Sequence, residues 1–168
     1  MNDTASSSPT PASLAKRRKF LVIVDETPEC EVAIQFASLR AKHTNGTVTL
    51  LHVIEPTDQQ QWLGVQNIMR EEARAEAESV LHRLAARVNE YSGSMPELII
   101  REGRRVEQMK QHIQEDPGIA ILVLASGTGK EGPGPLVSLI ARGADSGIAI
   151  PVTIVPGSLT EEAIQALA

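Results

Sequence analysis

Short apolar runs alternate along the chain with longer segments in which apolar residues recur every three or four positions. Apolar runs of strand length are typical of strands buried on both faces, and the three-to-four spacing indicates amphipathic helices. The pattern predicts five strands, at 21–24, 47–54, 98–100, 119–124 and 152–155. It predicts helices at about 28–44, 65–91, 106–113 and 136–146, and a short helix opening at 160–162.

Residues with special backbone preferences bound these elements. Thr27 is a suitable N-cap and Pro28 suits the first helical position, whereas Asn45-Gly46 is a helix stop signal. In segment 65–91 the apolar residues form one stripe and the opposite face is charged, with Arg74 and Glu78 four residues apart. That stripe consists of Met69, Ala73, Ala77, Leu81, Leu84, Val88 and Tyr91.

Strands that alternate with helices imply right-handed crossovers and a parallel sheet, so the fold class is α/β with an open five-stranded sheet. In such sheets, ligands bind beyond the carboxyl ends of the strands, where the strand order reverses. We therefore expect the functional site among segments 25–27, 54–55, 101–103 and 125–135.

Composition narrows the function classes. The 168 residues suffice for one domain, and a net charge of −5 argues against nucleic acid as a partner. No apolar run approaches the roughly 18 residues of a membrane span, so no membrane partner is expected. The single cysteine, Cys30, excludes an internal disulfide and favours the cytoplasm. Residues 1–18, rich in Ser, Thr, Pro and Ala, are expected to form a disordered tail.

The glycines of segment 127–135 have two interpretations. Gly127 to Gly132 matches G-x-G-x-x-G, but it follows the fourth strand and leads into Pro133-Gly134-Pro135, so we reject a dinucleotide fingerprint. The backbone amides could form an anion nest near a helix N-terminus, or the loop could require the freedom of glycine. Both interpretations stay open.

Other reactive side chains are sparse. The four histidines have no metal-ligand spacing, and no metal site is expected. His52 is interpreted as a hydrogen-bonded core histidine, and Cys30 as a packed, unreactive side chain. A hydrolase using Asp25 is disfavoured, because no convincing nucleophile or base stands beside it.

Four segments together resemble universal stress protein domains. They are Phe20–Thr27, Leu50–Pro56, Ile121–Ser126 and Ile150–Val155, and the resemblance covers residues 19–156. It implies a Rossmann-like sheet of order 3-2-1-4-5 with helices on both faces, frequent dimers and a role in stress physiology. Some members of this family bind ATP or AMP.

The nucleotide-binding members carry a glycine, two residues, a second glycine, nine residues, and then glycine with Ser or Thr. Aligned without gaps, Ala125, Thr128 and Ser138 replace the three glycines, and the hydroxyl lies one place early, at Ser138. Asp25 and Val53 match the positions that flank the adenine in binding members. The resemblance therefore implies a retained base site and a rewritten phosphate site.

Two hypotheses for the function follow. The favoured one is a cytoplasmic, non-enzymatic stress-response regulator or binding module with a degenerate adenine-nucleotide site and no cofactor. The alternative is an ATP- or AMP-binding protein with a rewired glycine-rich phosphate loop. In that case Asp25 and Val53 contact the base, and the residues near the phosphates are Ser126, Gly127, Gly129 and Ser138.

The fifth strand is the expected dimer interface. In the order 3-2-1-4-5 it is an edge strand, and residues 150–155 are apolar and uncharged, which favours pairing with a second copy. A competing cover is the C-terminal extension, residues 157–168, as a short helix that packs Ile164 and Leu167 over the edge.

Overall fold

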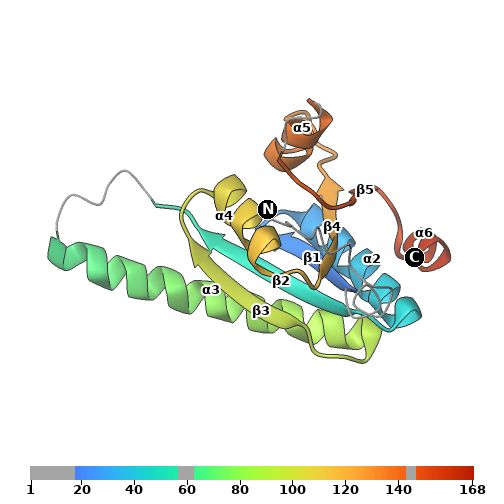
Figure 1. The fold of residues 1–168 in the computed structure, drawn as a ribbon, viewed down its shortest axis with the longest axis horizontal. Helices are drawn as coiled ribbons and strands as arrows, with labels where there is room; N and C mark the ends of the chain where they lie inside the picture. Colours follow the sequence, from blue (N-terminus) through green and yellow to red (C-terminus); the bar gives the residue numbers. More distant parts are fainter. Residues whose placement is uncertain (1–17, 57–62, 143–146) are drawn as a thin grey trace, which may run out of the picture.

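The chain folds into one five-stranded parallel sheet with helices on both faces (Figure 1). The computed structural model describes residues 18–56, 63–142 and 147–168. The strands are β1 Lys19–Val24, β2 Thr47–Ile54, β3 Glu97–Glu102, β4 Ile119–Ser126 and β5 Val152–Pro156. The helices are α2 Pro28–Thr44, α3 Leu63–Ser92, α4 Arg105–Glu115, α5 Pro135–Ala141 and α6 Glu161–Leu167. The expected tail falls largely on residues 1–17, outside the described residues.

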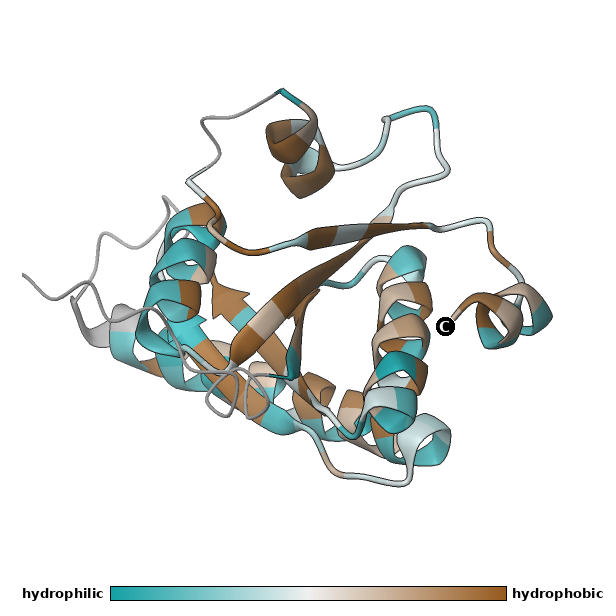
Figure 2. Cartoon of the chain, turned by 45° about the vertical axis from the view of Figure 1, so that its right-hand side comes forward, coloured by the Kyte–Doolittle hydropathy of each residue, from teal (hydrophilic) through white to brown (hydrophobic). Residues whose placement is uncertain are grey.

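The strand order is β3-β2-β1-β4-β5, as the resemblance implies, and the fold class is confirmed. Alternate side chains of β1 enter two separate cores. Phe20, Val22 and Val24 pack with α2 and α3, whereas Leu21 and Ile23 pack with α4 and α5. Figure 2 shows the apolar strands between helices whose polar residues face outward. The sheet is thus covered on both faces, as parallel sheets require.

Local signals set most helix ends. Asn45 adopts the left-handed conformation, with φ of 54°, and the Gly46 amide donates to the Ala41 carbonyl at 2.8 Å, which ends α2. Thr27 occupies the N-cap position of α2 and Pro28 follows it, as the sequence predicts, although the Thr27 side chain makes no capping hydrogen bond to the helix. Helix α5 ends at Ala141, earlier than expected, and residues 143–146 lie outside the described part.

Helix α3 is buried over only part of its length. Ala77, Leu81, Leu84 and Val88 are buried, whereas Met69, part of the same expected stripe, is exposed. A helix of 30 residues is about 45 Å long, while an eight-residue strand spans about 27 Å. The N-terminal half of α3 therefore runs past the sheet (Figure 1). None of the helices in the described part is long and apolar enough to cross a membrane.

The C-terminal extension folds as the expected short helix but packs elsewhere. The Thr160 hydroxyl oxygen accepts from the Ala163 amide at 3.3 Å and caps α6. Ile164 is 1% exposed and α6 contacts α2, whereas Leu167 is 63% exposed. The expectation that Ile164 and Leu167 cover the β5 edge is therefore wrong. Within the described residues, β5 pairs with β4 alone.

We predict that Ile164→Ala lowers the free energy of unfolding by about 2–4 kcal/mol, because it removes the buried contact between α6 and α2. Leu167→Ala, on the exposed face of the same helix, is the matched control and should change it by less than about 0.5 kcal/mol. Urea unfolding followed by circular dichroism measures both. Equal effects of the two substitutions would contradict the docking of α6 on α2.

Candidate functional site

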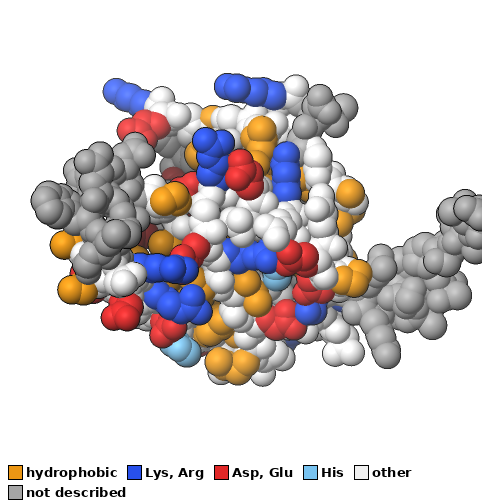
Figure 3. Space-filling model, turned by 60° about the vertical axis from the view of Figure 1, so that its left-hand side comes forward, with side chains coloured by type: hydrophobic (Ala, Val, Ile, Leu, Met, Phe, Trp, Pro, Cys, Tyr) orange, Lys and Arg blue, Asp and Glu red, His pale blue; other side chains and the backbone are white. Residues whose placement is uncertain are grey.

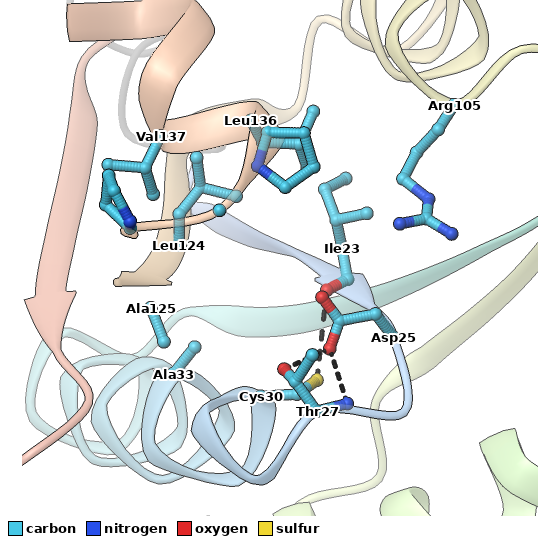
Figure 4. A pocket seen from close by; sticks show the side chains of 13 residues that line it. Ile23, Asp25, Thr27, Cys30, Ala33, Arg105, Leu124, Ala125, Leu136 and Val137 are labelled. Carbon is cyan, nitrogen blue, oxygen red and sulfur yellow. Dashed lines mark hydrogen bonds between the residues drawn. The ribbon is translucent and has the colours of Figure 1, made fainter. Parts of the chain in front are cut away.

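An open cleft lies at the carboxyl ends of β1 and β4, where the sheet continues in opposite directions from the centre. This is the switch point at which open α/β sheets bind ligands. The cleft measures about 780 Å³ and is bounded by the turn after β1, the loop after β4 and the start of α5. A smaller cavity of about 50 Å³ adjoins it and is lined by apolar side chains together with Asp25 and Arg105 (Figure 4).

The structure brings four of the six candidate residues together. Asp25, Gly127, Gly129 and Ser138 line the open cleft. Val53 and Ser126 are not among its lining residues. Val53 is 4% exposed and packs in the core beneath α4 and α5. The Ser126 carbonyl accepts a hydrogen bond from the Gly157 amide at 3.1 Å, at the end of β4.

Asp25 organises the turn between β1 and α2. Its Oδ1 accepts hydrogen bonds from the Thr27 amide, at 3.0 Å, and from the Thr27 hydroxyl (Figure 4). This is the local pairing by which an aspartate stabilises a turn two residues on. Asp25 therefore has a structural role at the cleft whether or not a ligand binds there.

Glu29 contributes a contact that the sequence did not reveal. From the first turn of α2, its Oε1 accepts from the Thr128 amide at 3.3 Å and from the Thr128 hydroxyl at 3.2 Å. Bonds from its own amide and from the Thr128 amide lower the pKa of Glu29. An ionised carboxylate of this chain thus binds the backbone amide of Thr128, the position that the resemblance aligns with the second glycine of the phosphate loop.

Two further amides of the loop also have partners within it. The Gly127 amide donates to the Pro133 carbonyl at 3.1 Å, and the Gly132 amide donates to the Gly129 carbonyl at 3.2 Å. A Cβ at Gly127 would lie 2.7 Å from the Gly132 carbonyl oxygen, so only glycine permits this approach. Of the two interpretations of these glycines, the structure favours a closed turn over an open nest of amides.

The charges at the cleft are mainly negative. Among the described residues that line it, Asp25, Glu29 and Glu131 carry carboxylates and Arg142 is the cation. Arg105, in the adjoining small cavity, pairs with Glu55 at 3.1 Å. The face drawn in Figure 3 interleaves basic and acidic side chains and has no continuous basic patch in its described part. This arrangement is unfavourable for a polyanionic group.

Cys30 and His52 are the two potentially reactive side chains that the sequence predicts to be core residues. The Cys30 thiol is buried and donates to the Ile23 carbonyl at 3.8 Å, and burial raises its pKa to about 12. This agrees with a packed, unreactive cysteine. His52 differs from expectation, because its buried Nδ1 has no hydrogen-bond partner among the described residues. Burial, together with the charge of Arg105, lowers the pKa of His52. The described residues contain no metal-binding cluster.

Glu29, Arg105 and Arg142 are the cleft and cavity residues that sequence reasoning missed. Acidic residues are common in the first turn of a helix, because their negative charge interacts favourably with the helix dipole. The sequence therefore contained no sign that Glu29 also contacts the loop after β4. Its partner Thr128 is 99 positions away.

Comparisons with known proteins agree with this fold. The sequence model described as the universal stress protein family matches residues 16–156. A search of curated proteins gave no match. Among solved structures, universal stress protein UspA from Lactobacillus plantarum is similar, with a TM-score of 0.68 at 17% identity, covering 83% of this chain and 97% of that one.

Two further similar structures were solved with nucleotides. A universal stress protein in complex with cAMP has a TM-score of 0.61 at 16% identity, covering 84% of this chain and 98% of that one. A family protein from Arabidopsis thaliana with AMP bound has a TM-score of 0.55 at 18% identity, covering 83% of this chain and 91% of that one. At these identities the likeness shows the fold.

We predict that Asp25→Ala lowers the free energy of unfolding by about 1 kcal/mol, because it removes both bonds to Thr27. Asp25→Asn retains an acceptor oxygen and should be affected less. If an adenine nucleotide is the ligand, Asp25→Ala also abolishes its binding while the fold stays intact. Melting temperature and nucleotide titration are measured side by side, and a large loss of stability with unchanged affinity would contradict a role for Asp25 in binding.

Proposed function

The chain belongs to the universal stress protein family, and we propose that within it this protein is a non-enzymatic stress-response regulator or binding module. It acts in the cytoplasm as a homodimer, and its adenine-nucleotide site is degenerate. The observation that carries the proposal is the bond of the Glu29 carboxylate to the amide and hydroxyl of Thr128. The loop that would bind phosphate is closed by an anion of the same chain.

Displacing Glu29 would be costly for a nucleotide. A phosphate would have to compete with a carboxylate already bonded to Thr128, and it would leave that ionised carboxylate beside its own negative charge. Asp25 and Glu131 add like charge around the cleft, and like charges at close range disfavour binding. In the closed turn, the Gly127 amide already donates its hydrogen bond to the Pro133 carbonyl, so it is not free to bind a phosphate.

The reactive side chains near the cleft support the proposal that the protein is not an enzyme. Cys30 is buried with a high pKa, so it is a poor nucleophile. The Thr128 hydroxyl does donate a hydrogen bond to the Glu29 carboxylate. The pKa of Glu29 is lowered, however, so this carboxylate is a weak base near neutral pH. Asp25 is engaged in the turn with Thr27.

A homodimer through β5 is supported by the state of that strand. Within the described residues its outer edge has no strand partner, and Ile154 is 39% exposed. Helix α6 packs on α2 and leaves this edge available. An apolar, uncharged edge strand is a template for pairing with another chain. A second copy of β5 supplies the matching edge.

One observation favours the alternative of an ATP- or AMP-binding protein. The cleft of about 780 Å³ is within the range of small-molecule sites, roughly 300–1,000 Å³, and it contains Arg142, a suitable partner for phosphate. Structures of the same fold were solved with cAMP and with AMP. In this alternative the nucleotide displaces Glu29 from Thr128.

Isothermal titration with Mg-ATP tests the proposal. We predict that the full chain binds more weakly than about 100 μM, and that Glu29→Gln tightens binding by about tenfold, because it removes the competing negative charge. Glu26→Gln is the matched control. It removes the same charge from an exposed residue that does not line the cleft, and it should change the affinity less than about threefold.

A dissociation constant in the low micromolar range for the unmodified chain would overturn the proposal and favour the nucleotide-binding alternative. Equal effects of Glu29→Gln and Glu26→Gln would show that the internal carboxylate does not close the phosphate site.

Light scattering tests the dimer. We predict that the full chain is a dimer and that Ile154→Lys makes it a monomer, because a charge on the apolar edge opposes pairing. Leu167→Lys introduces the same charge on the exposed face of α6 and should leave the dimer intact. A monomeric full chain, or a dimer that survives Ile154→Lys, would contradict an interface through β5.

A further inference from the structure

A second hollow lies away from the cleft, between three helices. Its floor is α2, one wall is the C-terminal part of α3, and the other wall is α6. Figure 2 shows α6 alongside α2, and the hollow measures about 570 Å³. We refer to it as the α6 groove. Helix α6 lies beyond residues 16–156, which the family model matches, so this groove depends on the chain's own extension.

Gln35, a residue in the floor of the α6 groove, has a buried donor without a partner among the described residues. Gln35 is 6% exposed, and its Nε2 has no hydrogen-bond partner among the described residues. A buried donor without a partner costs about 1–3 kcal/mol. The terminal torsion of glutamine is broad, so the amide can turn toward an acceptor in the groove. A carbonyl or carboxylate oxygen bound there would satisfy it.

The α3 wall is rigid because Arg87 is fully engaged. Its Nε donates to Glu31 at 2.7 Å, Nη1 donates to Glu90, and Nη2 donates to the Tyr91 hydroxyl. The guanidinium lies 5.0 Å from the centroid of the Tyr91 ring. Arg87 therefore shapes the wall, and the charges available to a ligand come from the other two helices.

Those available charges lie at opposite ends of the groove. The Ala168 carbonyl oxygen lies 3.0 Å from His43 Nδ1, so the C-terminal end of α6 adjoins the Lys42 end of the groove. Glu161 is the first residue of α6, about 10 Å from Ala168 along the helix, and therefore lies at the other end. Lys42 is seven residues beyond Gln35 on α2, which is about 10 Å along the helix. Neither Lys42 nor Glu161 forms an ion pair within the described residues. Leu39 and Gln165 line the stretch between them.

We propose that the α6 groove binds a short zwitterionic peptide of two or three residues. Its ammonium group pairs with Glu161, its carboxylate pairs with Lys42, and a backbone carbonyl accepts from Gln35. An extended tripeptide spans about 10 Å, which matches the length of α6 from Glu161 to the end that adjoins Lys42. The Gln165 amide can bond a second peptide group, and Leu39 contacts the backbone or a small side chain.

Titration of the full chain with trialanine, followed by calorimetry, tests this proposal. Trialanine should bind, and the form with an acetylated N-terminus and an amidated C-terminus should bind at least about tenfold more weakly. Two singly blocked peptides separate the ends. Lys42→Met should abolish the preference for a free carboxylate, and Glu161→Gln should abolish the preference for a free ammonium group.

Matched controls carry the same charge changes outside the groove. Lys130→Met removes an exposed cation from the loop after β4, and Glu162→Gln removes the carboxylate next to Glu161 on α6. Both should retain both preferences. No binding of trialanine at about 10 mM, equal binding of the fully blocked peptide, or the same loss in the controls as in Lys42→Met and Glu161→Gln would overturn the proposal.

Discussion

The central strand β1 must be buried on both faces, and the rest of the architecture follows from that constraint. Its neighbours β2 and β4 pair with it in parallel, so the strands have to be joined by crossover connections that contain helices and pack on a face of the sheet. Helices α2 and α3 cover one face, and α4 and α5 cover the other. Because β2 and β4 lie on opposite sides of β1, the turn after β1 and the loop after β4 separate at the carboxyl ends of these strands and bound the cleft.

The cleft at the carboxyl ends of β1 and β4 has one of its donors occupied from within the chain. Asp25 remains at the end of β1, and the loop after β4 still faces it. The donor of that loop at Thr128 is occupied by Glu29, a residue of α2. A carboxylate held by a backbone amide and a hydroxyl satisfies the loop without a ligand. In the function proposed above, this one side chain closes the position to an external anion.

A C-terminal extension could cover the β5 edge or pack on a helix, and α6 does the second. By packing Ile164 on α2 it leaves the β5 edge uncovered, so the extension does not block pairing of that strand. It also adds a wall beside α2 and so completes the α6 groove. The β5 edge and the α6 groove consequently lie on different elements, and they can be altered independently.

Local patterns in the sequence determined the elements and the fold. Apolar runs such as Leu21–Val24, the stop at Asn45-Gly46 and the helix that opens at 160–162 depend on neighbours within a few residues, and the structure contains all three. Only the tertiary structure decided what those elements bring together.

The pairing of Glu29 with Thr128 joins residues 99 positions apart, and the docking of Ile164 on α2 depends on a surface that exists only after folding. The half-exposed stripe of α3 and the unpartnered Nδ1 of His52 have the same origin, because burial depends on which distant element covers a residue. Periodicity specifies which face of an element is apolar, whereas the partner of a polar side chain is set by packing between elements.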